Sequence, residues 1–294
     1  MRKSFPVEDL ARDDRFVRVP MTERFNDPRT ARMEQAGSKK RTGPGRLTPD
    51  RPDAPDAARG LMHGIFVGEI QALEGAGRTC WDFVAGSGQS TPNDPDAASR
   101  VPFELKLDMA RQCWDEARHV EISCKLSEWM GTAIGEFAES TMLFEAACNE
   151  DPVLRLTGVN RALEGLAIDV VNTMREFGQT AGDPVLEFCE DWMLADEVTH
   201  VKMGSDWLRK LTVNDKERQE RALEFQRIVD KLFSLGGFRG EEDDSPVRLA
   251  RRFRELAGFT EEENDSLSAL ARESTEQARQ MAEAATAAFD AQSN

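Results

Sequence analysis

DEARHV at residues 115–120 and DEVTHV at residues 196–201 are two copies of one pattern, and this repetition decides the fold. The two copies contain two of the three histidines in the chain. A Glu and a His three residues apart on a helix lie on the same face, about one turn apart, so each copy can hold a metal ion. We therefore predict two helices that present Glu116 with His119, and Glu197 with His200, to a shared interior.

The remaining periodicity is helical, and no run of alternating β-branched residues bounded by turns occurs, so the predicted class is all-α. We expect an extended basic arm over residues 1–55, a four-helix bundle over residues 56–212, and appended helices over residues 213–294. The predicted bundle helices span residues 57–86, 102–131, 151–182 and 184–211, with a shorter helix at 134–148. Later helices are predicted from a cap at Asn214 to Leu235, from Ser245-Pro246, and from a Thr260/Glu263 capping box.

Composition excludes several classes of protein. The chain has 294 residues and a formal charge of −16, with +5 in residues 1–52 and −21 in the remainder, which argues against nucleic-acid binding by the body. The sequence contains no apolar run long enough to predict a membrane-spanning helix. Its five cysteines show no C-x-x-C spacing, which indicates free thiols in a reducing compartment, so we expect a cytoplasmic protein. Tyrosine is absent, and each of the five tryptophans is predicted to be a core or packing residue.

A metal pair needs one further carboxylate from each of the two other bundle helices. Glu164 lies in an apolar stretch, where an unpaired acid would be costly to bury. In the first helix, Glu69 and Glu74 compete because they lie about 140° apart. The sequence around Glu74 matches ALEG at 162–165, whereas aligning Glu69 with Glu164 and comparing the loop lengths favours Glu69.

Four carboxylates and two neutral imidazoles would balance the charge of two divalent ions, and this donor set suits iron or manganese. No His-Glu-x-x-His motif of a zinc protease occurs. Asp115 and Asp196 point about 100° from their Glu neighbours, so they either orient the imidazole of a facing helix or are surface acids. The alternative to a metal site is that both Glu/His pairs lie on solvated faces, but two copies with buried acids on the other helices disfavour it.

The chain resembles the ferritin-like superfamily, and in particular a bacterial family of ferritin-like proteins of unknown function. The resemblance rests on LMHGIFVGEIQALE (61–74), LEGLAIDV (163–170) and DEVTHVKMGSDWL (196–208), and it covers residues 55–211. It implies a ferritin-like four-helix bundle with a di-metal site. Val67 stands where the family pattern has a second His, and His63 matches the first, as a capping or supporting group.

The resemblance also implies the ligand sets. One metal ion would be held by Glu69, Glu116 and His119, and the other by Glu164, Glu197 and His200, with Glu116 and Glu197 bridging.

Three uses of such a centre are expected from the sequence. The first is a non-haem di-iron or Fe/Mn oxygenase or oxidase that uses O₂ to oxidise a small molecule, with an external electron donor. The second is a ferroxidase or iron-handling protein, which the appendages at both ends disfavour, and the third is a di-manganese enzyme that consumes peroxide. A non-catalytic bundle does not explain buried acids. The amphipathic C-terminal helices suggest a homodimer.

Overall fold

The computed structural model describes residues 55–86, 100–132, 134–137, 139–241 and 245–292. The predicted basic arm lies outside these residues, apart from Pro55. Helices make up most of the described part, and its strands are limited to two pairs of two residues each, so the all-α prediction is confirmed. No helix in the described ranges is long and apolar enough to cross a membrane.

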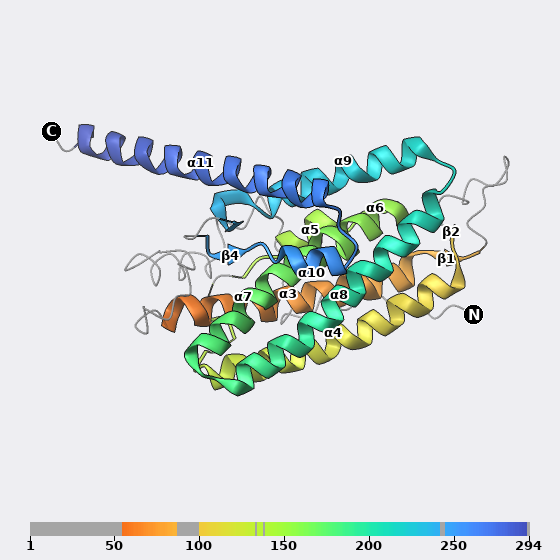
Figure 1. Cartoon of the computed structure of the whole chain (residues 1–294), viewed down its shortest axis with the longest axis horizontal. Helices are drawn as coiled ribbons and strands as arrows, with labels where there is room; N and C mark the ends of the chain where they lie inside the picture. Colours follow the sequence, from red (N-terminus) through yellow and green to blue (C-terminus); the bar gives the residue numbers. More distant parts are fainter. Residues whose placement is uncertain (1–54, 87–99, 133, 138, 242–244, 293–294) are drawn as a thin grey trace, which may run out of the picture. The chain divides into compact units, whose positions relative to one another are not determined.

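Four long helical segments form the bundle (Figure 1). Helix α3 (Pro55–Asp82) packs along α4 (Phe103–Trp129), and α7 (Glu164–Ala181) packs along α8 (Pro184–Thr212). Contacts between α4 and α8, and between α3 and α7, join the two pairs. The apolar core between them includes Met62, Ile168 and Met193, all fully buried. This arrangement brings the interior faces of all four helices to one place.

The sequence predicted one continuous helix over residues 151–182, but the structure divides this segment into three parts. It consists of α6 (Pro152–Leu156) and a π-helical stretch, η3 (Thr157–Leu163), that continues into α7. Two close approaches accompany the wide turn: a Cβ on Gly158 would lie 2.0 Å from the carbonyl oxygen of Ala147, and one on Gly204 would lie 2.2 Å from Cβ of Asn160. The π-helical stretch η3 is therefore closely packed against Ala147 on one side and against Gly204 on the other.

The ends of the bundle helices follow local rules. Asp151 and Asp183 cap α6 and α8 by accepting backbone N–H groups, each with a proline at the start of the helix. Gly182 ends α7 in the left-handed conformation, with φ of 69°. The loop predicted at 86–100 is flanked by two short strands, β1 (Val84–Ala85) and β2 (Arg100–Val101), which pair in parallel. Residues 87–99 of this loop lie outside the described part.

Several expected elements differ in the structure. Within 134–148 the helix is limited to α5 (Met142–Ala147), and residues 133 and 138 are outside the described part. Asp215, not Asn214, caps α9 (Lys216–Leu232). Ser245-Pro246 does not start a helix; β4 (Val247–Arg248) follows, pairs with β3 (Arg239–Gly240), and precedes α10 (Arg251–Leu256). A one-turn 3₁₀ helix, η4 (Leu235–Gly237), follows α9.

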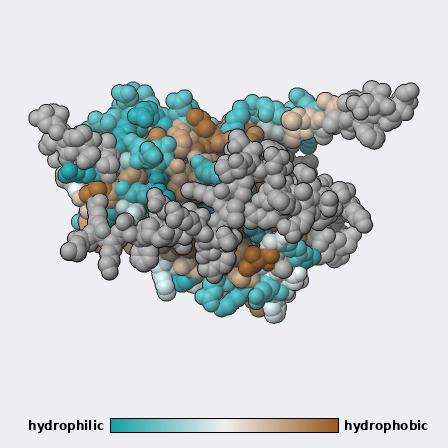
Figure 2. Space-filling view, turned by 180° about the vertical axis from the view of Figure 1, so that it is seen from behind, coloured by the Kyte–Doolittle hydropathy of each residue, from teal (hydrophilic) through white to brown (hydrophobic). Residues whose placement is uncertain are grey.

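The Thr260/Glu263 capping box is present. The Glu263 carboxylate accepts the N–H of Thr260 at 2.8 Å, and the Thr260 hydroxyl accepts the N–H of Glu263 at 3.2 Å. It begins α11 (Glu261–Gln292), which packs against α9 and η4. Of the five tryptophans predicted to be core or packing residues, Trp81, Trp114 and Trp129 are more than 60% exposed and are therefore not core residues, whereas Trp207 is buried. Hydrophobic areas also reach the face shown in Figure 2, between larger hydrophilic ones.

Candidate metal centre

The four bundle helices bring all six predicted ligands into one buried cluster. Glu116 and His119 come from α4, Glu197 and His200 from α8, Glu69 from α3 and Glu164 from the start of α7. Each of the six residues is at most 3% exposed. The alternative of solvated Glu/His pairs does not describe this structure. Glu69 enters the cluster whereas Glu74 is exposed, so the structure places the first of the two competing carboxylates in the interior.

The donor atoms form two overlapping groups. One consists of Glu69, Glu116, His119 and Glu197, and the other of Glu116, Glu164, Glu197 and His200, with the donor atoms of each group within 4.8 Å of one another. Glu116 and Glu197 belong to both groups.

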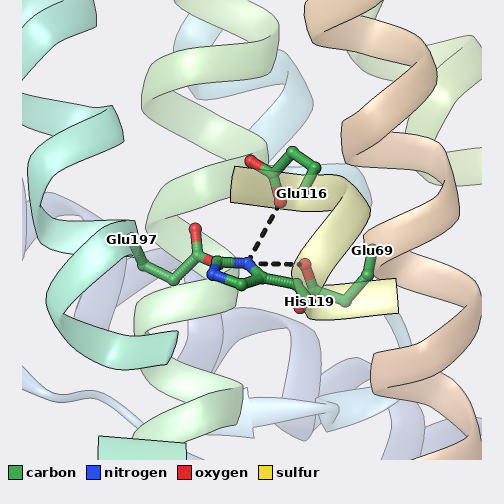
Figure 3. Close-up of side chains that lie close together, drawn as sticks. All are labelled: Glu69, Glu116, His119 and Glu197. Atoms are coloured by element: carbon green, nitrogen blue, oxygen red, sulfur yellow. Dashed lines mark ion pairs between the residues drawn. The ribbon is translucent and has the colours of Figure 1, made fainter. Parts of the chain in front are cut away.

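Figure 3 shows the first group around His119, whose Nδ1 lies 3.0 Å from Glu197, 3.2 Å from Glu116 and 3.4 Å from Glu69 oxygens. In the second group, Nδ1 of His200 lies 3.0 Å from Oε1 of Glu116 and 3.4 Å from Oε2 of Glu197.

Several of these atoms have no hydrogen-bond partner although they are buried. They are Nδ1 of His119 and one carboxylate oxygen each of Glu69, Glu116, Glu164 and Glu197. The oxygens of Glu69, Glu116 and Glu197 in this set contact Nδ1 of His119 as ion pairs, without hydrogen-bond geometry. Buried polar groups are normally hydrogen-bonded, so acceptors that converge in this way fit a cation among them. Oxygen and imidazole donors without thiolates fit iron or manganese. The residues therefore fit a buried metal site, and the two shared carboxylates fit a pair of ions.

Aspartates of the facing helices hold the far sides of the two imidazoles. Nε2 of His119 on α4 lies 3.3 Å from Oδ2 of Asp196 on α8, and Nε2 of His200 on α8 lies 3.4 Å from Oδ2 of Asp115 on α4. Arg118 donates to both aspartates. A carboxylate at Nε2 favours the tautomer with the proton there, which leaves the lone pair of Nδ1 facing the cluster. Asp115 and Asp196 were predicted either to orient an imidazole of the facing helix or to be surface acids, and the structure shows that both contact an imidazole.

Protonation reflects the crowding of acids. Burial, together with the charge of Glu197, raises the pKa of Glu69 to about 8, and burial with the charge of Glu116 raises the pKa of Glu164 well above its usual value. Burial opposes ionisation of Glu116 and Glu197 too, but the neighbouring imidazoles outweigh it and lower the pKa of both. Burial disfavours charged His119 and His200, yet their carboxylate partners raise both pKa values. In the metal-free protein, protons on the glutamates and histidines of the cluster therefore offset the negative charge that bound metal ions could offset instead.

Three functional candidates were missed at the sequence level. Gln112 donates to Glu164 at 2.5 Å and to Glu116 at 3.2 Å, and Asn160 in η3 donates to Gln112 at 2.6 Å. Glu190 is fully buried with both oxygens unpaired, and burial and the charge of Glu69 raise its pKa. The missed signal is spacing: Gln112 and Asn160 precede the ligands Glu116 and Glu164 by one helical turn, and Glu190 precedes Glu197 by two.

His63 lies outside both groups of donor atoms. It is 1% exposed, its Nε2 accepts the N–H of Gly135 at 3.2 Å, and the same atom lies 3.3 Å from Oε1 of Glu139. These contacts connect α3 to the segment before α5, which agrees with a supporting role for His63.

Comparison with known proteins gives one family. A family model described as "Protein of unknown function (DUF455)" matches residues 3–265. The match extends at both ends beyond residues 55–211, where the motifs quoted above lie. Neither the curated proteins nor the solved structures include a significant match to this chain.

Proposed function

The chain belongs to the DUF455 family, and we propose that it is a di-metal carboxylate oxidoreductase of the ferritin-like type that uses O₂ to oxidise a small organic molecule. The overlap of the two groups of buried donors at Glu116 and Glu197 carries this proposal. These two carboxylates would help to hold both ions. Glu69 and His119 would complete one site, and Glu164 and His200 the other.

When bound, two Fe(II) ions or an Fe/Mn pair would supply electrons to O₂ and open coordination positions. The residues around them have separate tasks. Asp115 and Asp196 keep Nδ1 of the imidazoles available, and Gln112 holds one oxygen of Glu164. In a hydroxylation, one oxygen atom of O₂ enters a C–H bond of the substrate and the other leaves as water, with two electrons and two protons from an external donor.

An apolar cavity beside Glu69 supports an organic substrate over iron handling. The cavity has a volume of about 370 Å³, within the range of small-molecule sites, and its walls are mostly aliphatic and aromatic. A path for hydrated iron ions would need polar or acidic walls, because transfer of an ion into apolar surroundings is strongly unfavourable. The net charge of −16 agrees with a substrate that is not phosphorylated.

Anaerobic reconstitution with Fe(II) or Mn(II), followed by metal analysis, tests the site. We expect about two ions per chain, as two buried groups of donors imply. Glu116→Ala and His200→Ala should bind much less metal. Glu69→Gln and Glu74→Gln form a matched pair on one helix, and only the buried position should lose metal. Fewer than one ion per chain in the unaltered protein would contradict the proposal.

Exposure of the iron-loaded protein to O₂ in the presence of a small-molecule extract tests the reaction. Mass spectrometry should find a product heavier by one oxygen atom or lighter by two hydrogen atoms, formed over many turnovers with a reductant. O₂ consumption that stops after a few equivalents of iron, with no organic product, would instead assign the protein to iron handling.

A further inference from the structure

The cavity beside the metal centre is built from both halves of the described chain. One wall is the glycine-containing face of α3, and the opposite wall is α7 around Leu166 and Val170. Phe233 and Phe238, which flank η4, close a further side. The segment after the four-helix bundle is therefore part of the cavity wall.

The lining shows what chemistry the cavity accepts. None of the described residues in its wall is Lys, Arg or His, and polar side chains are limited to Glu69, Gln71 and Ser140. The amide of Gln71 is already engaged at both ends, because it donates to the carbonyl of Val67 and accepts the N–H of Phe144, each at 3.0 Å. Among these described residues an anionic group would find no cation to offset its desolvation.

Glu69 connects the cavity to the metal centre. Its side chain lines the cavity and also belongs to the first group of donors, 3.4 Å from Nδ1 of His119. Leu163, immediately before Glu164, lines the cavity on the α7 side. The cavity thus adjoins α3 and α7, the helices that contribute carboxylates without imidazoles. On the α4 and α8 side, the Asp115–Arg118–Asp196 group contacts the imidazoles instead.

We propose that this cavity binds the organic substrate, and that the substrate is an uncharged molecule with an extended hydrocarbon portion that ends beside Glu69. The proposal rests on the proposed function for the identity of its ligand as substrate. The binding site itself rests on the cavity alone. Burial of a hydrocarbon chain against aliphatic walls supplies affinity, and a chain too long for the cavity gains nothing further.

Gly64 provides a specific way to fill the cavity. It lines the wall within α3, and a Cβ at this position would meet no atom within 4 Å, so a larger side chain has room. Its φ is not positive, so a residue with a side chain adopts the same backbone. Gly64→Leu should fill space that the hydrocarbon needs. Gly64→Ala makes the same change of backbone preference with little added volume and is the matched control.

The test is displacement of the neutral fluorophore N-phenyl-1-naphthylamine by 1-alkanols of increasing length. We expect one probe per chain, and alkanol affinity that rises up to about fourfold per methylene before it levels off. Gly64→Leu should weaken probe and 1-decanol binding at least tenfold, whereas Gly64→Ala should bind like the unaltered protein. Thermal melting of both variants checks that they fold.

Three outcomes would overturn the proposal: no probe binding, equal binding by Gly64→Leu, or tighter binding of decanoate or decylamine than of 1-decanol. The assay is run with metal-free and Mn(II)-loaded protein, so it separates the two proposals. Probe binding without metal binding would remove the proposed function and leave the cavity site. Metal binding and O₂ consumption without probe binding would remove the cavity site and leave the proposed function.

Discussion

Each imidazole of the centre lies between ligand carboxylates at Nδ1 and an aspartate of the opposite helix at Nε2. The arrangement is reciprocal: α4 contributes the aspartate for the histidine of α8, and α8 contributes the aspartate for the histidine of α4. Each Asp-Glu-x-x-His copy therefore contains a candidate Glu/His ligand pair and the aspartate that contacts the histidine of the other copy. The repetition of the aspartate in the sequence has a physical reason.

Asp196→Asn and Asp115→Asn are expected to weaken metal binding about 10- to 100-fold, because an amide stabilises the required imidazole tautomer less than a carboxylate does. Mn(II) titration followed by electron paramagnetic resonance measures the change. Glu121→Gln, on the exposed side of α4, is the control and should leave the affinity unchanged. Affinity within twofold of the unaltered protein in both aspartate variants would show that these contacts are incidental.

Stability of the metal-free protein is expected to fall as the pH rises from about 6 to about 8. Glu69 has a pKa raised from 4.5 to about 8, so above pH 4.5 folding takes up a proton and becomes less favourable until that pKa is passed. His119 and His200 have raised pKa values, so their stabilisation is complete below 6.5 and is lost with rising pH. Metal ions displace these protons, so they should stabilise more at pH 8 than at pH 6.

Melting temperatures with and without Mn(II) at several pH values measure this linkage. Glu69→Gln removes one of the titrating groups and should flatten the metal-free profile. A metal-free melting temperature that increases over the same interval would contradict the assignment of protons to the cluster.

The sequence predicted which acids and histidines gather in the buried cluster better than it predicted the residues around them. Glu-x-x-His spacing and single acids on apolar helices are local signals, and they brought Glu69, Glu116, His119, Glu164, Glu197 and His200 to attention. Gln112 and Glu190 carry no such motif, since a Gln or Glu on a helix is most often exposed. Their burial depends on which face of α4 and α8 the other helices cover, which is a property of the assembled bundle.

At the scale of elements, the π-helical stretch η3 places an amide beside the centre. Asn160 donates to Gln112, which in turn donates to Glu164 and Glu116. π-helical turns are often found at functional sites because they change the direction of side chains. The sequence predicted one continuous helix over 151–182, since its apolar periodicity fits an ordinary α-helix. The wide turn goes with contacts to Ala147 and Gly204, which periodicity does not contain.

Gly204→Ala is expected to destabilise the protein by about 2–4 kcal/mol. Its new methyl group would lie 2.2 Å from Cβ of Asn160, so η3 or α8 must move. Urea unfolding gives the free energy, and Mn(II) affinity reports whether the Asn160–Gln112 contact shifts. Gly77→Ala is the matched control, because its nearest heavy atom beyond the helix is 3.7 Å away. It should be neutral or stabilising by up to about 1 kcal/mol. Equal stabilities of the two variants would mean that η3 adapts freely.

Buried ion pairs connect α7 of the bundle to the segment that follows the bundle. Asp169 accepts from Arg254 at 3.0 Å and from the N–H of Ala250 at 2.9 Å, and it lies 3.5 Å from Arg239. Arg239 also pairs with Asp230 at 2.8 Å. Asp169, Arg239 and Arg254 are each at most 2% exposed. These pairs dock the segment that contributes Phe233 and Phe238 to the cavity, so they connect folding of the C-terminal part to the shape of the proposed substrate cavity.

Asp169→Ala is expected to reduce the free energy of unfolding by about 3–5 kcal/mol, because it leaves Arg254 buried without its carboxylate partner. Hydrogen exchange should increase most in residues 232–241 and 245–256, and N-phenyl-1-naphthylamine should bind more weakly, while Mn(II) affinity changes little. Asp169→Leu combined with Arg254→Met removes both charges and should recover part of the stability, since Arg239 keeps Asp230 as a partner. Lys125→Met removes an exposed ion pair and serves as the control. Faster exchange spread evenly over α4 and α8 would show that Asp169 stabilises the entire fold and does not specifically dock the C-terminal segment.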